Sequence, residues 1–363
     1  MALNLYDLVN AKPLAEYIEA KVSNTVPYLG ATLFPATKIQ GLSLEWLLGY
    51  DELPVSLAPS AFDSKAPIRD RIGVASINTQ LPFFREATTI GEKQRQEILG
   101  LLALNNNQYI RPAIERIFDD SYRLVQGAEV VAERERISLL VDGSISISSD
   151  AKDSRVSKVA YNYDVDNKWH TNNYSTITDS AKKWSDTANS NPLQDILDRV
   201  RTAKNFNGTV LTRGIVSSKT WGYILANQNI KKAINPLGAA NLIITPTDLR
   251  NFILINTGVT LTVYDKVYAD KSGTVHQFYP DDYITLLPAD TLGQTVYGTT
   301  PEEADLVYAQ SGESSSALVQ VVNTGVAITT ERETHPVNIK TIVSALVLPS
   351  FPRIANVFTI KVA

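Results

Sequence analysis

The sequence predicts an α+β fold built from more than one packed unit, and three observations support this prediction. From Tyr109 to Leu140, apolar residues recur three and four positions apart, which is the spacing of one buried face of a helix. Several shorter stretches alternate apolar and polar residues, as half-buried strands do. The length of 363 residues favours two or more cores over one.

The composition narrows the range of functions. The chain is 44% hydrophobic and 20% charged, as ordinary globular proteins are, and its net charge of -4 implies no strong phosphate-binding surface. It contains no cysteine, which excludes disulfides, zinc–thiolate sites and cysteine nucleophiles and is compatible with assembly in a reducing cytoplasm. It has neither a run of about 18 apolar residues nor a signal-peptide pattern at its N-terminus, so we expect no membrane association.

Residues 1–38 are predicted to form an N-terminal arm without a core of its own. Two amphipathic stretches, Leu5–Val9 and Leu14–Ile18, are interrupted by Pro13 and followed by Pro27. Neither stretch is long enough to form a stable isolated helix, so the arm must dock on another surface.

Residues 39–88 are predicted to form a protruding two-stranded ribbon. Gln40–Leu47 and Ile72–Leu81 alternate like strands. Between these strands lie three prolines and a charged cluster, namely Pro54, Pro59, Pro67 and Arg69, Asp70, Arg71. A two-stranded ribbon is marginally stable in water and needs a partner surface. The alternative is a hairpin folded back onto its own domain.

Residues 89–165 are predicted to form a domain around the long helix. A shorter helix over Ile90–Leu104 precedes the long helix. A β-hairpin formed by Ser144–Ser148 and Arg155–Tyr163 follows it.

The long helix, Tyr109–Leu140, is expected to act as a spine on which other elements pack. Asn105–Asn107 offer N-caps, Pro112 is tolerated near the first turn, and Asp142-Gly143 ends the helix. Gly127, near the middle, costs about 1 kcal/mol relative to alanine, and we predict that the helix bends there. Close packing of a C-terminal strand against Gly127 is the alternative, whereas the irregular apolar stripe disfavours a coiled-coil arm.

Residues 166–317 are predicted to form a mixed α/β lobe, because helices and strands alternate along them. The predicted helices and strands are a helix opened by Asn191-Pro192, a helix from Ser217 to Asn227, and strands at Gly208–Thr212, Val259–Val267 and Tyr283–Leu287. Thr291–Ser316 is predicted to be a long loop. Residues 318–363 are predicted to form three strands of one sheet, namely Val319–Thr330, Ile339–Leu348 and Val357–Val362.

No catalytic, cofactor-binding or metal site is predicted. His170, His276 and His335 are too far apart for a metal-ligand spacing, and the chain lacks phosphate-loop, zinc-protease and nucleophile-elbow motifs. Three acidic pairs fit solvated charge better than general acids, namely Asp119-Asp120, Asp281-Asp282 and Glu302-Glu303. These patterns indicate assembly rather than an enzyme.

The order of these parts resembles the HK97-like fold of tailed-bacteriophage major capsid proteins, and within it the lambda major head protein family, also called capsid protein E. The resemblance covers nearly the whole chain and rests on the order of its motifs. They are residues 39–55, Ile68–Arg71, 109–143, Phe278–Asp282 with Thr285–Leu287, Asn338–Leu348 and Val357–Val362. The resemblance implies five parts: an N-terminal arm (1–38), an E-loop (39–88), a P-domain with spine helix and hairpin (89–165), an A-domain (166–317) and C-terminal strands completing the P-domain sheet (318–363).

The resemblance implies a major capsid protein that self-assembles as hexamers and pentamers into an icosahedral shell. The shell would enclose phage double-stranded DNA without sequence-specific binding, and the protein would be part of the virion, assembled in the host bacterial cytoplasm. The E-loop begins near Ile39 with no scaffolding region ahead of the arm, which implies a separate scaffold protein besides a portal. The resemblance also allows a decoration protein and a maturation protease.

An arm without a core and a ribbon with open edges are not expected to bury their apolar faces in a monomer, but they become interfaces in a shell. We therefore predict that Arg69, Asp70 and Arg71 contact a neighbouring subunit. The alternatives are an encapsulin-like protein compartment and, from another class, an α/β hydrolase with an unrecognised site.

Overall fold

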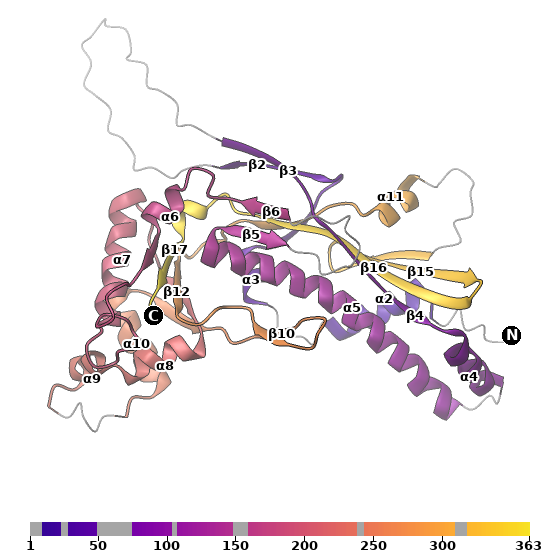
Figure 1. The fold of residues 1–363 in the computed structure, drawn as a ribbon, viewed down its shortest axis with the longest axis horizontal. Helices are drawn as coiled ribbons and strands as arrows, with labels where there is room; N and C mark the ends of the chain where they lie inside the picture. The colour runs from indigo at the N-terminus through magenta and orange to yellow at the C-terminus, as the bar shows by residue number, and fades with distance from the viewer. Residues whose placement is uncertain are drawn as a thin grey trace, which may run out of the picture. The chain divides into compact units, whose positions relative to one another are not determined.

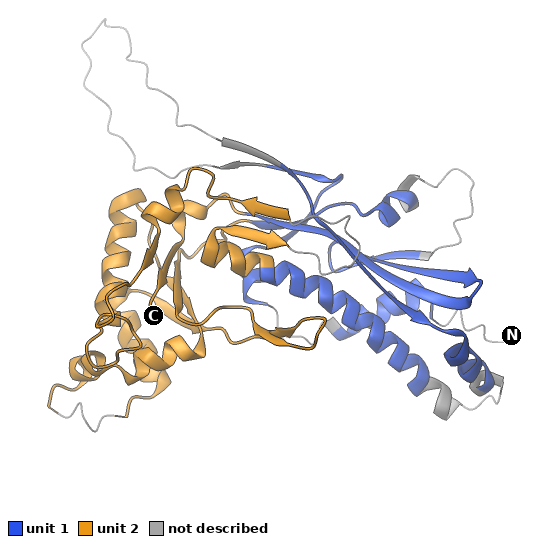
Figure 2. Cartoon of the chain, in the orientation of Figure 1, with its two compact units in different colours: residues 1–45, 78–134, 294–350 blue, residues 46–77, 135–293, 351–363 orange. Residues whose placement is uncertain are grey.

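The chain forms two compact units, and neither is a continuous segment (Figure 2). The computed structural model describes residues 9–22, 28–48, 75–103, 107–147, 159–237, 243–308 and 318–363. Unit 1 comprises residues 1–45, 78–134 and 294–350, and unit 2 comprises residues 46–77, 135–293 and 351–363. Each unit is therefore assembled from segments that lie far apart in sequence.

Unit 1 is built around its longest strand, β16 (Val337–Ser350), which is paired along both edges (Figure 1). One edge pairs antiparallel with β15 (Val326–Thr334), and β15 pairs antiparallel with β14 (Leu318–Val322). From Thr341 to Ser350 every residue of β16 is buried, as in strands that are covered on both faces.

Two further strands pair with successive parts of β16. β4 (Phe83–Ile90) pairs with residues 339–346 of β16, and β13 (Gln294–Tyr297) pairs with residues 347–350. β1 (Ala36–Lys38) adds to β13 in parallel. The end of the predicted arm is thus a strand of this sheet.

Helices complete the core of unit 1. α2 (Ala11–Val22) places Leu14 and Ile18 in a cluster with residues of α5 (Asn107–Asp142) and of the sheet. Leu14 and Ile18 are 1% and 0% exposed, so the apolar face of the arm helix is buried within unit 1. The described part of unit 1 also contains α3 (Leu29–Leu33), α4 (Glu92–Ala103) and α11 (Pro301–Tyr308).

The predicted spine is confirmed, because α5 is one helix from Asn107 to Asp142 (Figure 1). Its end is fixed by Gly143, whose N–H donates to the carbonyl of Leu139 at 3.1 Å. Gly143 has a φ of 63°, and a Cβ there would lie 3.0 Å from the Trp169 ring. Glycine is the residue that fits both the backbone conformation and the space.

Unit 2 is built on a five-stranded sheet in the order β7-β17-β12-β8-β9. The strands are β7 (Tyr174–Thr176), β17 (Phe358–Lys361), β12 (Tyr283–Leu287), β8 (Arg213–Val216) and β9 (Thr260–Val263). β12 pairs antiparallel with β17 and with β8, whereas β7 pairs with β17 and β9 with β8 in parallel.

Helices with capped N-termini surround this sheet. The Asn191 side chain accepts from the N–H of Gln194 and opens α7 (Pro192–Asn207), and Ser217 opens α8 (Ser218–Ala226), both as predicted. The described part of unit 2 also contains α6 (Lys168–Asn172), α9 (Gln228–Ile234), α10 (Pro246–Thr257) and the 3₁₀ turn Ile354–Asn356. The core between the helices and the sheet includes the fully buried Trp184.

Three two-stranded elements complete the fold. The predicted ribbon is found as β2 (Ser43–Leu48) paired with β3 (Ala75–Gln80), and the segment between these strands lies outside the described residues. The predicted hairpin is found as β5 (Ser144–Ile147) and β6 (Val159–Asn162). A further hairpin in unit 2 joins β10 (Val267–Ala269) and β11 (Val275–Gln277).

The structure corrects the predicted C-terminal sheet. The stretch Val319–Thr330 is not one strand but parts of β14 and β15, which are separated by a turn in which Asn323 and Thr324 have positive φ. Val357–Val362 does contain a strand, but β17 pairs with β12 of unit 2 and not with β16 of unit 1. The strands of residues 318–363 therefore do not share one sheet.

Other differences are local. The strand predicted at Gly208–Thr212 lies at β8 instead, because Gly208 adopts a φ of 74° and ends α7. The predicted loop Thr291–Ser316 contains β13 and α11. The predicted strand Val259–Val267 contains β9 and the start of β10 instead of one strand. The sequence patterns also missed β4 and β7. Pro13 does not interrupt the arm helix, since it lies in the first turn of α2.

Candidate assembly surfaces

Of the two sites predicted from the sequence, the helix bend and the charged cluster of the ribbon, only the first lies among the described residues. Gly127 lies exposed on α5, and a Cβ added there would meet no atom of the described residues within 4 Å. The close-packing explanation of Gly127 is therefore wrong, and a bend at this position stays a prediction. Arg69, Asp70 and Arg71 lie outside the described residues.

The base of the β2–β3 ribbon is held by unit 1. The N–H of Thr299 donates to the carbonyl of Gly41 at 3.2 Å, and the N–H of Leu81 donates to the carbonyl of Leu42 at 2.8 Å. A Cβ on Gly298 would lie 2.8 Å from the Gly41 carbonyl oxygen and 2.6 Å from Leu81 Cδ1. The ribbon therefore starts from a backbone contact that leaves no room for a side chain at residue 298.

The arm helix is held on α5 by a polar group as well as by its apolar face. The Tyr17 hydroxyl donates to Asp119 Oδ1 at 2.7 Å, and the Lys21 ammonium donates to the same oxygen. These hydrogen bonds, that of Lys21 first, lower the pKa of Asp119, and the bond to Asp119 raises the pKa of Lys21. The Asp119 side chain is 45% exposed, as expected of a solvated carboxylate, and it also connects two elements of unit 1.

This docking corrects one premise of the assembly argument. The arm was not expected to bury its apolar face in a monomer, yet Leu14 and Ile18 are buried in the same subunit. The described part of the arm, residues 9–22 and 28–38, is thus a structural part of unit 1.

The acidic pair of α11 ties that helix to the sheet of unit 1. Glu303 Oε2 accepts from Lys38 Nζ at 2.5 Å. The Glu302 carboxylate accepts from the Arg85 guanidinium and, at 2.8 Å, from the Ser344 hydroxyl. No local pattern of residues indicates these partners, because Arg85 lies 217 residues before Glu302.

Asp282, of the third acidic pair, links several elements of unit 2 by hydrogen bonds. Asp282 has a φ of 68°, and its carboxylate accepts from the Tyr223 hydroxyl at 3.0 Å and from Lys219 Nζ at 3.1 Å. The hydrogen bond to Asp282 raises the pKa of Lys219. The Asp282 carbonyl accepts from the N–H of Val362 at 2.8 Å, so this residue joins α8, β12 and the segment after β17.

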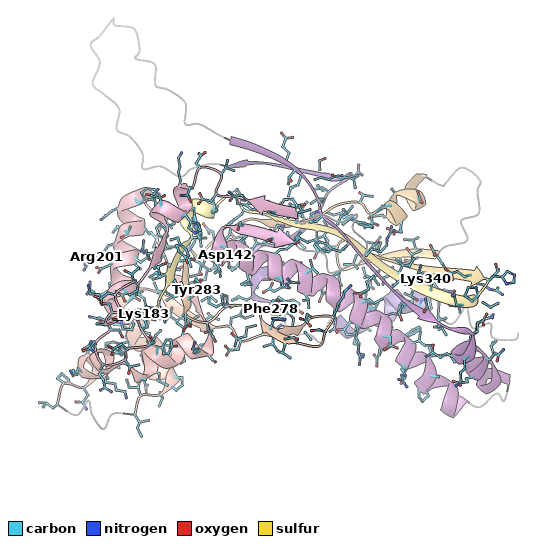
Figure 3. The ribbon with its side chains drawn as sticks, in the orientation of Figure 1. Asp142, Lys183, Arg201, Phe278, Tyr283 and Lys340 are labelled. Carbon is cyan, nitrogen blue, oxygen red and sulfur yellow. The ribbon has the colours of Figure 1, made fainter. Side chains whose placement is uncertain are left out.

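The β10–β11 hairpin exposes apolar side chains of unit 2. Val267 is 54% exposed and Val275 is 65% exposed, and the strand register places both on one face of the hairpin. On the opposite face Tyr268 stacks on His276 and contacts Phe278. Figure 3 labels Phe278, which follows β11. A hairpin with an exposed face that carries two valines is suited to contact with another subunit.

The histidines serve local structure in the described part of the chain. His276 Nε2 lies 3.0 Å from Asp270 Oδ2 at the tip of the β10–β11 hairpin, and His170 stacks on Tyr174. No group of three metal-ligating side chains occurs among the described residues. None of the helices in that part combines the length and the apolar character needed to cross a membrane.

Solved structures share this fold. The proposed capsid protein of a prophage of Escherichia coli CFT073 is 16% identical over 100% of both chains, with a TM-score of 0.58. A phage-related protein from Bordetella bronchiseptica RB50 is 11% identical over 97% of both chains, with a TM-score of 0.53. We found no match among curated proteins.

The sequence itself matches a family model described as phage major capsid protein E over residues 10–362, which include segments of both units. This match agrees with the α+β fold shared with the prophage protein and with the expectation drawn from the order of the motifs. The chain belongs to the phage major capsid protein E family and is a shell-forming protein of the HK97-like type.

Proposed function

We propose that the chain assembles as hexamers and pentamers into the icosahedral shell of a tailed phage, around double-stranded DNA that it does not bind sequence-specifically. The observation that carries this proposal is the family match over residues 10–362. The open apolar face of the β10–β11 hairpin supports it, because Val267 and Val275 would be covered by a neighbouring subunit.

The charge of the protein is consistent with this role. A net charge of -4 gives the inner surface no strong affinity for phosphate, so packaged DNA can enter and leave. We propose a separate scaffold protein and a portal as partners, a decoration protein as a further one, and assembly in the cytoplasm of the host bacterium. The chain itself acts as a structural protein and has no catalytic role in this proposal.

Sedimentation and electron microscopy of the purified chain test the proposal. We expect capsomers or closed shells, formed by the chain alone or after its scaffold protein is added. A monomer that persists at every protein concentration and ionic strength, with the scaffold present, would contradict it.

The ribbon cluster is the proposed contact within this shell. Arg69, Asp70 and Arg71 carry both signs of charge in a segment whose base is fixed on unit 1. We propose that they pair with opposite charges of a neighbouring subunit.

A further inference from the structure

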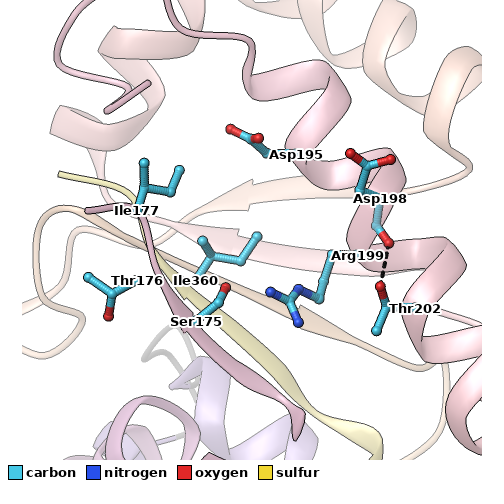
Figure 4. A pocket seen from close by; sticks show the side chains of 8 residues that line it. All are labelled: Ser175, Thr176, Ile177, Asp195, Asp198, Arg199, Thr202 and Ile360. Carbon is cyan, nitrogen blue, oxygen red and sulfur yellow. Dashed lines mark hydrogen bonds between the residues drawn. The ribbon is translucent and has the colours of Figure 1, made fainter. Parts of the chain in front are cut away.

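A pocket of about 230 Å³ in unit 2 is lined by an arginine that has no hydrogen-bond acceptor among the described residues. It is bordered by α7 and by strands β7 and β17 (Figure 4), and its lining residues are Ser175, Thr176, Ile177, Asp195, Asp198, Arg199, Thr202 and Ile360. Figure 4 shows the Arg199 side chain extending from α7 toward Ser175 of β7. All of these residues belong to unit 2.

The Arg199 guanidinium is half-buried and has no hydrogen bond or ion pair within the described part of the chain. Burial lowers its pKa, although the nearby Asp195 carboxylate opposes that shift. A guanidinium stays charged in proteins and carries five N–H donors. Asp195 offsets part of this charge, but the guanidinium N–H groups are partly removed from water and have no hydrogen-bond acceptor among the described residues, so a ligand that accepts from them is favoured.

The two carboxylates of the pocket are already engaged. Asp195 Oδ2 accepts from Trp184 Nε1 at 2.8 Å, and Asp198 Oδ1 accepts from Gln194 Nε2 at 2.7 Å. The Thr202 hydroxyl donates to the Asp198 carbonyl at 2.8 Å. The Arg199 guanidinium and the Ser175 hydroxyl are therefore the donors left for an incoming acceptor.

The charges around the pocket select the kind of acceptor. Asp195 and Asp198 flank Arg199 and repel any anion, and this repulsion grows with the charge of the anion. A polyanion such as the DNA backbone is therefore disfavoured more strongly than a single carboxylate, whose pairing with the guanidinium opposes the repulsion. Its volume suits one side chain, and a planar carboxylate matches the two-pronged geometry of a guanidinium.

We propose that the Arg199 pocket receives an aspartate or glutamate side chain from a second copy of this chain. This inference rests on the proposed assembly and names one of its contacts. Arg199 and Ser175 donate to the incoming carboxylate, and the engaged Asp195 and Asp198 exclude larger anions.

Chemical modification of arginine tests the proposal directly. Phenylglyoxal should modify Arg199 in unassembled subunits and about tenfold more slowly in shells that contain no DNA, as mass spectrometry of the peptides would show. Protection confined to DNA-filled shells would overturn the proposal in favour of a nucleic-acid phosphate. Equal reactivity in subunits and in shells would overturn it outright and leave the proposed assembly intact.

Two substitutions on α7 provide the matched comparison. Arg199→Gln keeps a hydrogen-bonding side chain but removes the charge, and it should raise the subunit concentration needed for assembly by about tenfold. Lys204→Ala, on the same helix, removes an exposed cation that is not part of the pocket lining, and it should leave assembly unchanged. The melting temperatures of the unassembled variants separate a folding defect from an assembly defect, because Arg199→Gln should melt as the wild type does. If both variants assemble like the wild type, the proposal is wrong.

Discussion

Gly127 occupies an exposed position in α5 where an added methyl group would meet open space. We therefore expect Gly127→Ala to stabilise the isolated subunit by up to about 1 kcal/mol, through helix propensity alone. If the glycine serves a bend during maturation, the variant shell should expand slowly or under harsher conditions. Denaturant unfolding of the subunit and electron microscopy of expanding shells measure the two effects.

Gly298→Ala is the matched control for that variant. Its new methyl group would press on the Gly41 carbonyl, so we expect a loss of about 1–3 kcal/mol of subunit stability. A Gly127→Ala shell that expands at the wild-type rate would show that the glycine is not needed for a bend.

Asp119 makes the docking of the arm depend on pH. Its pKa is lowered from the ordinary 3.8, so its ionised form stabilises the folded subunit above that pH. The contribution is lost as the pH falls through the lowered pKa. We expect Asp119→Asn to lower the melting temperature near pH 7, with a difference from the wild type that shrinks progressively below about pH 4. A difference that stays constant across this range would exclude the carboxylate as its cause.

Among the elements, α2 shows what strand and helix patterns in the sequence can and cannot predict. The amphipathic pattern from Leu14 to Ile18 indicates a helix with one apolar face, and the structure contains that helix. The surface that covers the face is formed by α5 and β14–β16, which are distant in sequence, so no local pattern could identify it. For that reason, the sequence pattern alone led to the prediction that another subunit covers the apolar face of α2.

Ile18→Ala tests this assignment. Ile18 is fully buried against α5 and the sheet, so its truncation should destabilise the isolated subunit by about 2–5 kcal/mol in urea unfolding. Glu16→Ala, on the exposed face of the same helix, should leave stability nearly unchanged. If the Ile18→Ala subunit keeps its stability but fails to assemble, the apolar face of α2 forms a contact between subunits and not a part of the core of unit 1.

Strands were harder to predict than the spine for a related reason. α5 repeats its apolar spacing over about ten turns, and no other structure fits such a period. β4 begins Phe83-Phe84-Arg85-Glu86, which does not alternate, and it is a strand because β16 offers it a partner. Arg199 likewise has no sequence signature, since its pocket exists only where α7 meets β7 and β17.

For the whole molecule, the ribbon cluster offers the assembly test. Arg69→Glu with Arg71→Glu should leave the circular dichroism and melting temperature of the subunit unchanged, because an exposed pair contributes about 0–1 kcal/mol. Shell yield should fall, since the same mismatch recurs at every equivalent contact. Sedimentation at low and high ionic strength measures that yield. Wild-type yield would remove the cluster from the interface, and a loss of circular dichroism would make these residues structural.

The position of β17 inside the sheet of unit 2 also orders events on the ribosome. β7, β8, β9 and β12 are synthesised first, and β13–β16 of unit 1 follow before β17 is made. At a translation rate of about 5–20 residues per second, several seconds pass between the synthesis of β12 and that of β17, and the facing edges of β7 and β12 stay unpaired with β17 during this time. The sheet of unit 2 is complete only after β17 has been made and inserted. We therefore expect subunits to join a growing shell only after that step.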